Sequence, residues 1–289
     1  YVPFELAMPW DGEWDELPAS HGAAIFFDLA TIVGLFVLGR RLRRARDDAS
    51  DEEAAAARSE GTALGIVLAF AWCAYPYTTY ALQSNSNDSL VAAGLIWALV
   101  AFASPVGRGV FLGMASMVKF APLALVPLFA MGERGLADRL RRPSADESGE
   151  RPSRFAWFGF GPVFWFSLAF VATCALLLLQ ATLDPGLKTF YDRTIAMQID
   201  RESPFSIWGQ EPGLEWLQTV VKVGAVGLAL LVAVVPRRRS VGQVAALAAA
   251  VLIGALLGVD HWFYLYLPWF FGLVLVALLP RARAGPPGS

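Results

Sequence analysis

The sequence predicts an all-α fold: a polytopic bundle of transmembrane helices that forms a single domain over residues 1–289. Three observations support this prediction. Hydrophobic residues make up 56% of the chain and charged residues only 17%, whereas soluble domains carry about 25% charged residues. The hydrophobic residues fall into separate runs, most of them near the length of about 20 residues that crosses a bilayer. Arginine clusters follow several of these runs, which is typical of the cytoplasmic ends of membrane spans.

The chain begins with an acidic, aromatic segment, residues 1–20, that contains five acids and no Lys or Arg. We interpret it as the remainder of a first external loop that rests on the membrane interface. The first predicted span, about residues 21–39, ends in a cluster that runs from Arg40 to Arg46. This span therefore runs from outside to inside, and we expect at least one further span upstream of Tyr1. Residues 40–61 are predicted to form a cytoplasmic loop.

Six further spans complete a predicted set of about seven. They are expected at about residues 62–82, 89–104, 155–183, 216–235, 241–259 and 261–279. The turn 83–88 and the long loop 184–215 are predicted to be extracytoplasmic. The loop 132–155, which carries six arginines, is predicted to be cytoplasmic.

The stretch 109–131 is 23 apolar-rich residues with a single charge, Lys119, in the middle. A lysine at the centre of a bilayer costs about 2.5–3.5 kcal/mol, so its side chain should face protein or water. Pro122 lacks an amide donor and its ring clashes with the preceding turn. The sequence therefore predicts that the helix breaks near residues 119–122.

The arginine clusters at 40–46 and 134–154 decide between two paths for this stretch. A full crossing would place the two clusters on opposite sides of the membrane. A re-entrant pair of half-helices at 109–131 places 18 of the 23 Lys and Arg residues on one side. Each half would hold about 10 residues and reach about 15 Å, to mid-membrane. We favour the re-entrant pair; the alternative is an ordinary crossing with topology set by other signals.

Candidate substrate-binding residues lie mainly in the loop 184–215. Arg193 and Arg201 suit a phosphate head group, because guanidinium groups hold phosphate oxygens bidentately. Gln198 and Trp208 suit a sugar ring, which offers apolar faces and polar edges. The alternative is a solvated loop that its aromatic residues anchor.

Other candidates lie outside that loop. Asn87 and Asp88 could cap the helix of the third span, and Asp88 could also face the active cavity. Lys119 could neutralise a lipid phosphate or form an ion pair within the bundle. His261, beside Asp260, could bind a phosphate or share a proton, or simply pack in the aromatic belt. Asp28, within the first span, is expected to make a packing hydrogen bond.

Several function classes have no support in the sequence. It contains no phosphate-binding P-loop, no glycine-rich dinucleotide fingerprint, no HExxH and no CxxC. We therefore predict no cofactor and no metal site. The basic clusters adjoin the predicted spans and fit membrane topology and anionic lipid, so nucleic-acid binding is not expected.

Five segments together resemble the GT-C superfamily of membrane glycosyltransferases, and most of all the bacterial family-87 mannosyltransferase-like proteins. They are residues 17–42, 87–99, 108–129, 193–209 and 260–270. The resemblance implies an enzyme of the plasma membrane that moves a sugar, mannose in this family, from a polyprenyl-phosphate carrier to an extracytoplasmic glycan or glycolipid acceptor, with inversion. A lysine at a break between two half-helices is also similar to that superfamily.

The resemblance also implies an Asp or Glu in the first external loop as general base. That acid normally lies near the start of the loop, and this chain begins part-way through it. The catalytic residue is therefore unknown, and we expect a chain that starts at Tyr1 to transfer no sugar. The alternative function is a transporter or flippase of lipid-linked sugars. Internal repeats would favour the transporter, and none is evident.

Overall fold

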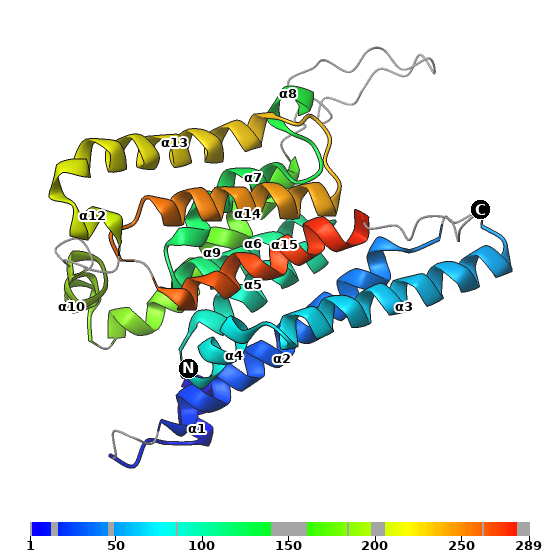
Figure 1. The fold of residues 1–289 in the computed structure, drawn as a ribbon. Coiled ribbons are helices and arrows are strands. Elements are labelled where there is room, and N and C mark those ends of the chain that lie inside the picture. The colour runs from blue at the N-terminus through cyan, green and yellow to red at the C-terminus, as the bar shows by residue number, and fades with distance from the viewer. Residues whose placement is uncertain are drawn as a thin grey trace.

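The fold is described from a computed structural model, which is helical and contains no β-strand in the parts described. Figure 1 shows helices of unequal length packed into one bundle. This confirms the predicted all-α class. The described residues are 2–12, 17–45, 49–84, 86–139, 161–183, 185–197, 206–261 and 263–281.

The helices fall into a first group that ends at α8 and a second group that begins at α9. The first group is α1 Val2–Ala7, α2 Pro18–Leu42, α3 Asp51–Cys73, α4 Pro76–Gln83, α5 Asp88–Val100, α6 Pro105–Val118, η1 Ala121–Leu125, α7 Val126–Met131 and α8 Leu136–Arg139. The second group is α9 Gly161–Leu183, α10 Leu187–Tyr191, the π-helical η3 Asp192–Ala196, α12 Ile207–Gln210, η4 Pro212–Leu214, α13 Glu215–Val234, α14 Val241–Leu257, η5 Tyr264–Tyr266, α15 Leu267–Leu278 and η6 Leu279–Arg281.

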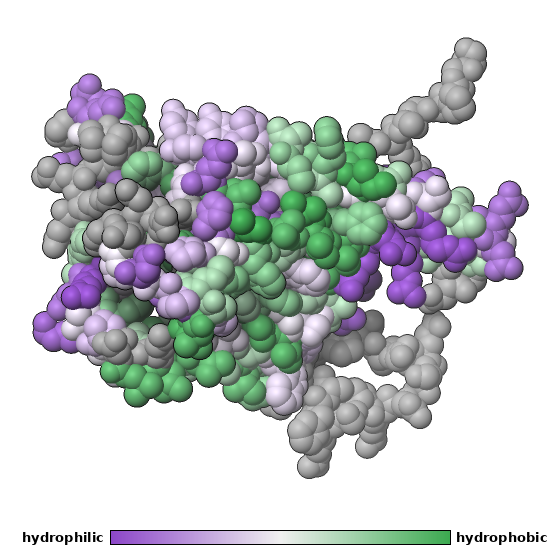
Figure 2. Space-filling view, turned by 90° about the horizontal axis from the view of Figure 1, so that it is seen from below, coloured by the Kyte–Doolittle hydropathy of each residue, from purple (hydrophilic) through white to green (hydrophobic). Residues whose placement is uncertain are grey.

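Three described helices are long and apolar enough to cross a membrane: Pro18–Leu42, Gly161–Leu179 and Glu215–Val234. Shorter apolar helices at 88–100, 121–131, 241–257 and 264–278 complete the bundle. Only 6% of the Gly161–Leu179 segment is buried, so an apolar face of α9 is left for lipid. Figure 2 shows hydrophobic residues mainly over the middle of one face and hydrophilic residues mainly toward its two ends. The chain is therefore a membrane protein.

The start of α3 differs from the prediction of a cytoplasmic loop over residues 40–61. The helix begins at Asp51 because Ser50 and Glu53 form a capping box. The Glu53 amide donates to Ser50 Oγ over 3.3 Å, and the Ser50 amide donates to Glu53 Oε2 over 2.9 Å. These bonds lower the pKa of Glu53, chiefly through the Ser50 amide. Acids in the first turn also favour the positive end of the helix dipole.

Helix α5 lies at the centre of the bundle and packs against α2, α6 and α15. All its residues except Leu90 and Trp97 are buried, including the charged Asp88 at its start. The hydrophobic core extends from α5 into α14 and α15. Beside it, Trp72 Nε1 donates to Asp28 Oδ1 over 2.9 Å, which confirms the packing hydrogen bond expected for Asp28.

The helix in the stretch 109–131 breaks where Pro122 predicts. Helix α6 ends at Val118, four residues before Pro122, because the proline ring would clash with that carbonyl in a continuous helix. Lys119 follows with extended backbone, φ −144° and ψ 146°. The chain then forms the short helices η1 and α7, each with a proline in its first turn.

The chain turns back on itself over this stretch, as predicted. A Cβ atom placed on Gly132, just after α7, would lie 2.8 Å from the guanidinium carbon of Arg108, near the start of α6. The two ends of the stretch therefore meet, and Lys119 lies at the tip of a hairpin. The first arm differs from the expected 10 residues: α6 has 14 residues, about 21 Å. The tip lies level with the start of α5, because Lys119 Nζ is 3.7 Å from Oδ1 of Asp88, the first residue of that helix.

The arginine clusters gather at one end of the bundle. Arg43 Nη2 donates to the carbonyl of Pro280 over 2.7 Å, and Arg41 donates to the carbonyl of Val100. The Gly135 amide donates to the Arg237 carbonyl over 2.7 Å. This basic end is where α2, α5, α7 and α13 finish, whereas α10 and α12 lie at the opposite end (Figure 1). The arginine clusters thus lie at the same end of the bundle, as expected if residues 109–131 form a hairpin rather than a full crossing.

Candidate functional site

A cavity of about 880 Å³ opens at the end of the bundle opposite the arginines. Its wall comes from the hairpin tip, α9, the α10–η3 segment, α13 and the segment around η5. The polar residues that line it are Asn87, Lys119, Arg193, Thr194, Lys222, Asp260 and His261. Four residues predicted from the sequence (Asn87, Lys119, Arg193 and His261) therefore line a single cavity, although they are far apart in the chain.

Lys119 is placed in the cavity wall by the break in the hairpin. Its Nζ lies 3.7 Å from Oδ1 of Asp88, and the two side chains are 31% and 3% exposed. Both predicted roles can therefore hold together: Lys119 forms an ion pair within the bundle while it also faces the cavity. A lone lysine at this depth would be costly, and the neighbouring carboxylate offsets part of that cost.

Asp88 lies behind the cavity wall and does not line it. Its Oδ1 accepts a 2.8 Å hydrogen bond from Trp269 Nε1, and its Oδ2 accepts one from Ser86 Oγ. The expected capping role of Asn87 is wrong, because Asn87 makes no side-chain cap bond. Instead Ser86 Oγ accepts from the Asp88 amide over 3.0 Å. Asp88 therefore holds Lys119 and Trp269, two residues of the cavity wall.

A second lysine–aspartate pair joins Lys222 to Asp260; the sequence singled out Asp260 only as the neighbour of His261 and did not predict Lys222 or the pairing. Lys222 Nζ lies 3.5 Å from Asp260 Oδ2. Oδ1 of Asp260 accepts a 2.6 Å hydrogen bond from Gln218 Nε2, one turn before Lys222 on α13. The signal that singled out Lys119, a lone lysine in an apolar span, was also present for Lys222. The tip of the hairpin and helix α13 thus each bring an amine to the same cavity.

Arg193 enters the cavity from the π-helical segment η3, which follows α10 directly. Single π-turns often occur at functional sites. On the same segment Lys188 and Asp192 form an exposed ion pair of 2.9 Å. The hydrogen bond to Asp192 raises the pKa of Lys188. The predicted residues Gln198 and Arg201 lie outside the described part of the chain.

Aromatic rings form part of the cavity wall. The rings of Tyr266 and Trp269 lie 4.4 Å apart with an angle of 31° between them. His261 packs edge-to-face on Phe263 at 4.4 Å. Of these four residues, all but Phe263 line the cavity. A wall of this kind can stack on the apolar face of a ring while its polar atoms bind hydroxyl groups.

Trp208 does not line the cavity. Its indole Nε1 donates to the carbonyl of Leu257 over 2.9 Å, next to the lining residue Leu256. The acids of residues 1–20 include two that are described, Glu5 and Asp11, and neither lines the cavity. Glu5 instead accepts a hydrogen bond from the Trp10 amide over 2.9 Å.

The fold and the cavity define a class: a polytopic membrane protein with a cationic, aromatic cavity at one end of its bundle. The family model of glycosyltransferase family 87 matches residues 16–268. The chain therefore belongs to glycosyltransferase family 87, which confirms the resemblance seen in the sequence. No curated protein and no solved structure matched the chain.

Proposed function

We propose that this glycosyltransferase moves a sugar, mannose as the most suitable candidate, from a polyprenyl-phosphate carrier to a glycan or glycolipid acceptor. The reaction would take place in the 880 Å³ cavity, on the extracytoplasmic side of the plasma membrane. The observation that supports this best is Lys119, which a helix break places in the cavity wall together with Arg193 and Lys222. Three cations in one cavity suit a phosphate that gains negative charge.

The wall of the cavity suits a donor that is attached to a lipid. Its apolar lining includes Leu177 and Leu178 of α9 and Met114 and Met117 of α6. Leu176 and Leu179, on the same apolar helix, are 69% and 54% exposed. An isoprenoid chain could therefore lie against α9 while its phosphate reaches Lys119. A nucleotide-sugar donor would have no use for such an apolar wall.

In the proposed reaction a hydroxyl oxygen of the acceptor attacks the anomeric carbon of the donor sugar. The new C–O bond forms on the face opposite the phosphate, so the anomeric centre inverts. The bond from the anomeric carbon to the phosphate oxygen breaks, and its electron pair stays with the polyprenyl phosphate. A carboxylate general base takes the hydroxyl proton. Lys119, Arg193 and Lys222 would stabilise the phosphate as it leaves.

Asp260 is the carboxylate among the described cavity residues. Gln218 and Lys222 each approach one of its oxygen atoms. These contacts suit a positioning residue for Lys222 better than a base, since a proton acceptor needs a free oxygen near the acceptor hydroxyl. The general base is therefore expected near the start of the first external loop rather than at Asp260.

The experiment follows radiolabelled mannose from polyprenyl-phosphate-mannose into lipid and glycan products. It uses membranes of cells that carry the natural gene, the same gene with Lys119→Gln, or no gene. Loss of a group that stabilises a leaving charge costs about 10²–10³-fold in rate, so K119Q should lower transfer by about 100-fold. The matched control is Lys188→Gln, which removes an amine that is 91% exposed and lies outside the cavity.

Two results would refute the proposal. One is normal transfer by K119Q at matched protein levels. The other is wild-type transfer from a nucleotide sugar in membranes that lack polyprenyl-phosphate sugars. Equal loss in K119Q and K188Q would also count against it, because the effect would then not come from the cavity.

A further inference from the structure

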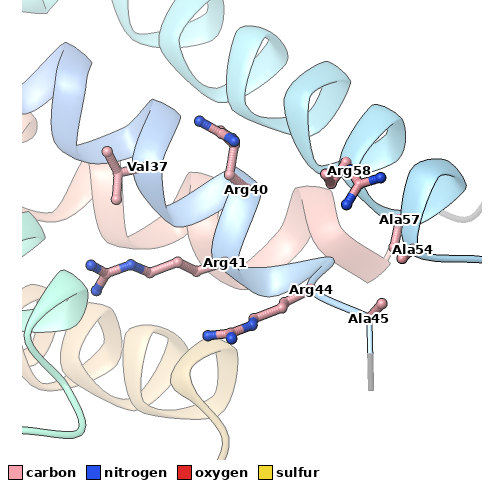
Figure 3. Close-up of a pocket in the computed structure, with 8 residues that line it drawn as sticks. All are labelled: Val37, Arg40, Arg41, Arg44, Ala45, Ala54, Ala57 and Arg58. Carbon is pink, nitrogen blue, oxygen red and sulfur yellow. The ribbon is translucent and has the colours of Figure 1, made fainter. Parts of the chain in front are cut away.

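A second cavity, of about 460 Å³, lies at the basic end of the bundle, far from the proposed transfer site. It opens between the end of α2 and the start of α3, and Figure 3 shows Arg40 and Arg41 on α2, Arg44 just after its end and Arg58 on α3. The residues that line it are Val37, Arg40, Arg41, Arg44, Ala45, Ala54, Ala57 and Arg58. From this cavity we infer a binding site for the phosphate head group of an anionic phospholipid, separate from the glycosyl-transfer reaction.

The two helices that form the cavity are held in fixed positions, because α2 and α3 pack in backbone contact just beside it. A Cβ atom on Gly39 would lie 2.3 Å from the Gly65 amide nitrogen. A Cβ atom on Gly61 would lie 3.0 Å from the Arg40 carbonyl. Only glycine permits such close approach. From this contact the two helices continue toward the connecting loop, and small alanine side chains leave room between them.

The four guanidinium groups have no counter-charge among the described residues. No described carboxylate lies within 4.0 Å of Arg40, Arg41, Arg44 or Arg58. The nearby acid Glu53 is used in the capping box, where its Oε2 accepts from both the amide and the hydroxyl of Ser50. Like charges gathered around one cavity repel each other, and a bound anion would relieve that repulsion.

The geometry favours a phosphate. Arg41 already donates one Nη to the carbonyl of Val100 at the end of α5, which fixes its position and leaves its other donors free of any described protein partner. Planar guanidinium groups present pairs of donors that match phosphate oxygens. A phosphodiester in this cavity would meet more than one arginine side chain.

The position in the fold favours a lipid rather than a free ion. Arg40 and Arg41 lie in the last turn of the apolar span Pro18–Leu42, and Arg44 directly follows it, at the level where head groups lie. Val37 forms the apolar side of the cavity, and Val33, one turn earlier on α2, is 51% exposed. An acyl chain could lie along these two residues while the head group enters the cavity. Basic pockets between helices at a membrane surface bind anionic head groups in this way.

The test uses the natural protein in nanodiscs of phosphatidylcholine with increasing fractions of phosphatidylglycerol. Native mass spectrometry counts the phosphatidylglycerol molecules that stay bound. The triple variant Arg40→Gln, Arg44→Gln, Arg58→Gln should hold the most tightly retained molecule at least about tenfold more weakly, because each basic residue near the surface contributes to this attraction. The control is Arg237→Gln, Arg238→Gln, which removes exposed charges from the same end of the bundle. This control should retain the lipid within about twofold of wild type.

Each of the following outcomes would overturn the proposed site or its assignment to a lipid. Equal weakening in the triple variant and the control means general attraction and overturns the site. Inorganic phosphate that displaces phosphatidylglycerol at comparable concentration means a free-anion site and overturns the lipid assignment. Each variant is also checked for folding by its thermal transition in phosphatidylcholine alone. If the triple variant unfolds early, Arg58→Gln alone replaces it, and unchanged lipid retention in that variant overturns the proposal.

Discussion

Nζ of Lys119 lies 3.7 Å from Oδ1 of Asp88, so the tip of the hairpin is joined to the start of the central helix α5. Asp88 is buried and also accepts a hydrogen bond from Trp269. One carboxylate thus connects three elements of the bundle: α5, the hairpin and α15. This connection explains how a lysine within an apolar stretch can be both structural and available to a ligand.

The first prediction concerns this pair. Asp88→Asn and Lys119→Gln should each destabilise the protein, and their effects should not add. Residues in direct contact show coupling energies of about 0.5–3 kcal/mol. Because the Lys119 side chain is 31% exposed, a value near the lower end is expected. Reversible unfolding of the four proteins of a double-mutant cycle in mixed micelles measures it. Additive effects would show that the ion pair contributes nothing to the hairpin.

The second prediction concerns Lys222, the cavity amine held by Asp260. If the proposed donor is used, Lys222→Gln should lower sugar transfer by about tenfold, since the leaving phosphate would lose one of its cations. Lys222→Arg keeps the charge and should retain most of the activity. The mannose-transfer assay compares both with wild type at equal protein level. Equal loss in the two variants would indicate that packing on α13, and not charge, is what matters.

The third prediction concerns Gly132, which ends the second arm of the hairpin where it meets the start of the first. Gly132 has φ +59°, and a Cβ atom there would meet the Arg108 guanidinium. Gly132→Ala should destabilise the protein by about 2 kcal/mol, through strained backbone and overpacking together. Gly224→Ala is the matched control, because nothing lies within 4 Å of the added Cβ atom on α13. Thermal unfolding of the detergent-solubilised protein compares them, and equal stability of the two variants would contradict the described turn.

The fourth prediction concerns the side of the membrane that each end of the bundle occupies. In the natural protein with Cys73→Ser and Cys174→Ser, a cysteine at Leu187 should react with an impermeant maleimide on intact cells. A cysteine at Arg237 should react only after the cells are permeabilised. Both positions are exposed. The reverse pattern would place the cavity in the cytoplasm and exclude a polyprenyl-phosphate donor presented from outside.

Much of this arrangement could be predicted because insertion into a bilayer imposes strong rules. Long apolar runs identify α2, α9 and α13, and the rule that basic residues stay on one side predicts the hairpin. Pro122 marks its break because the ring excludes a continuous helix. The start of α3 was missed, since a polar, alanine-rich segment gives no membrane signal. The Ser50–Glu53 capping box was the available clue.

The candidate site could be predicted only in part. Lys119, Arg193 and His261 stand out as polar groups in apolar or interfacial surroundings, and the structure brings them to one cavity. Asp88 was expected to face the cavity, but burial beneath its wall depends on how α15 packs on α5. Lys222 and Asp260 meet only through the contact of α13 with the segment after α14. No local pattern in the chain carries that information.

The most direct test of the proposed site is photo-crosslinking with a polyprenyl-phosphate-mannose analogue that carries a photoreactive group near its phosphate. The natural protein in membranes is irradiated, digested and mapped by mass spectrometry. Adducts should fall on the segments that form the cavity, at residues 114–121, 177–178 and 190–195, and unlabelled donor should compete them away. Adducts confined to the basic end, at residues 40–58, would contradict the assignment of this cavity to the lipid-linked sugar.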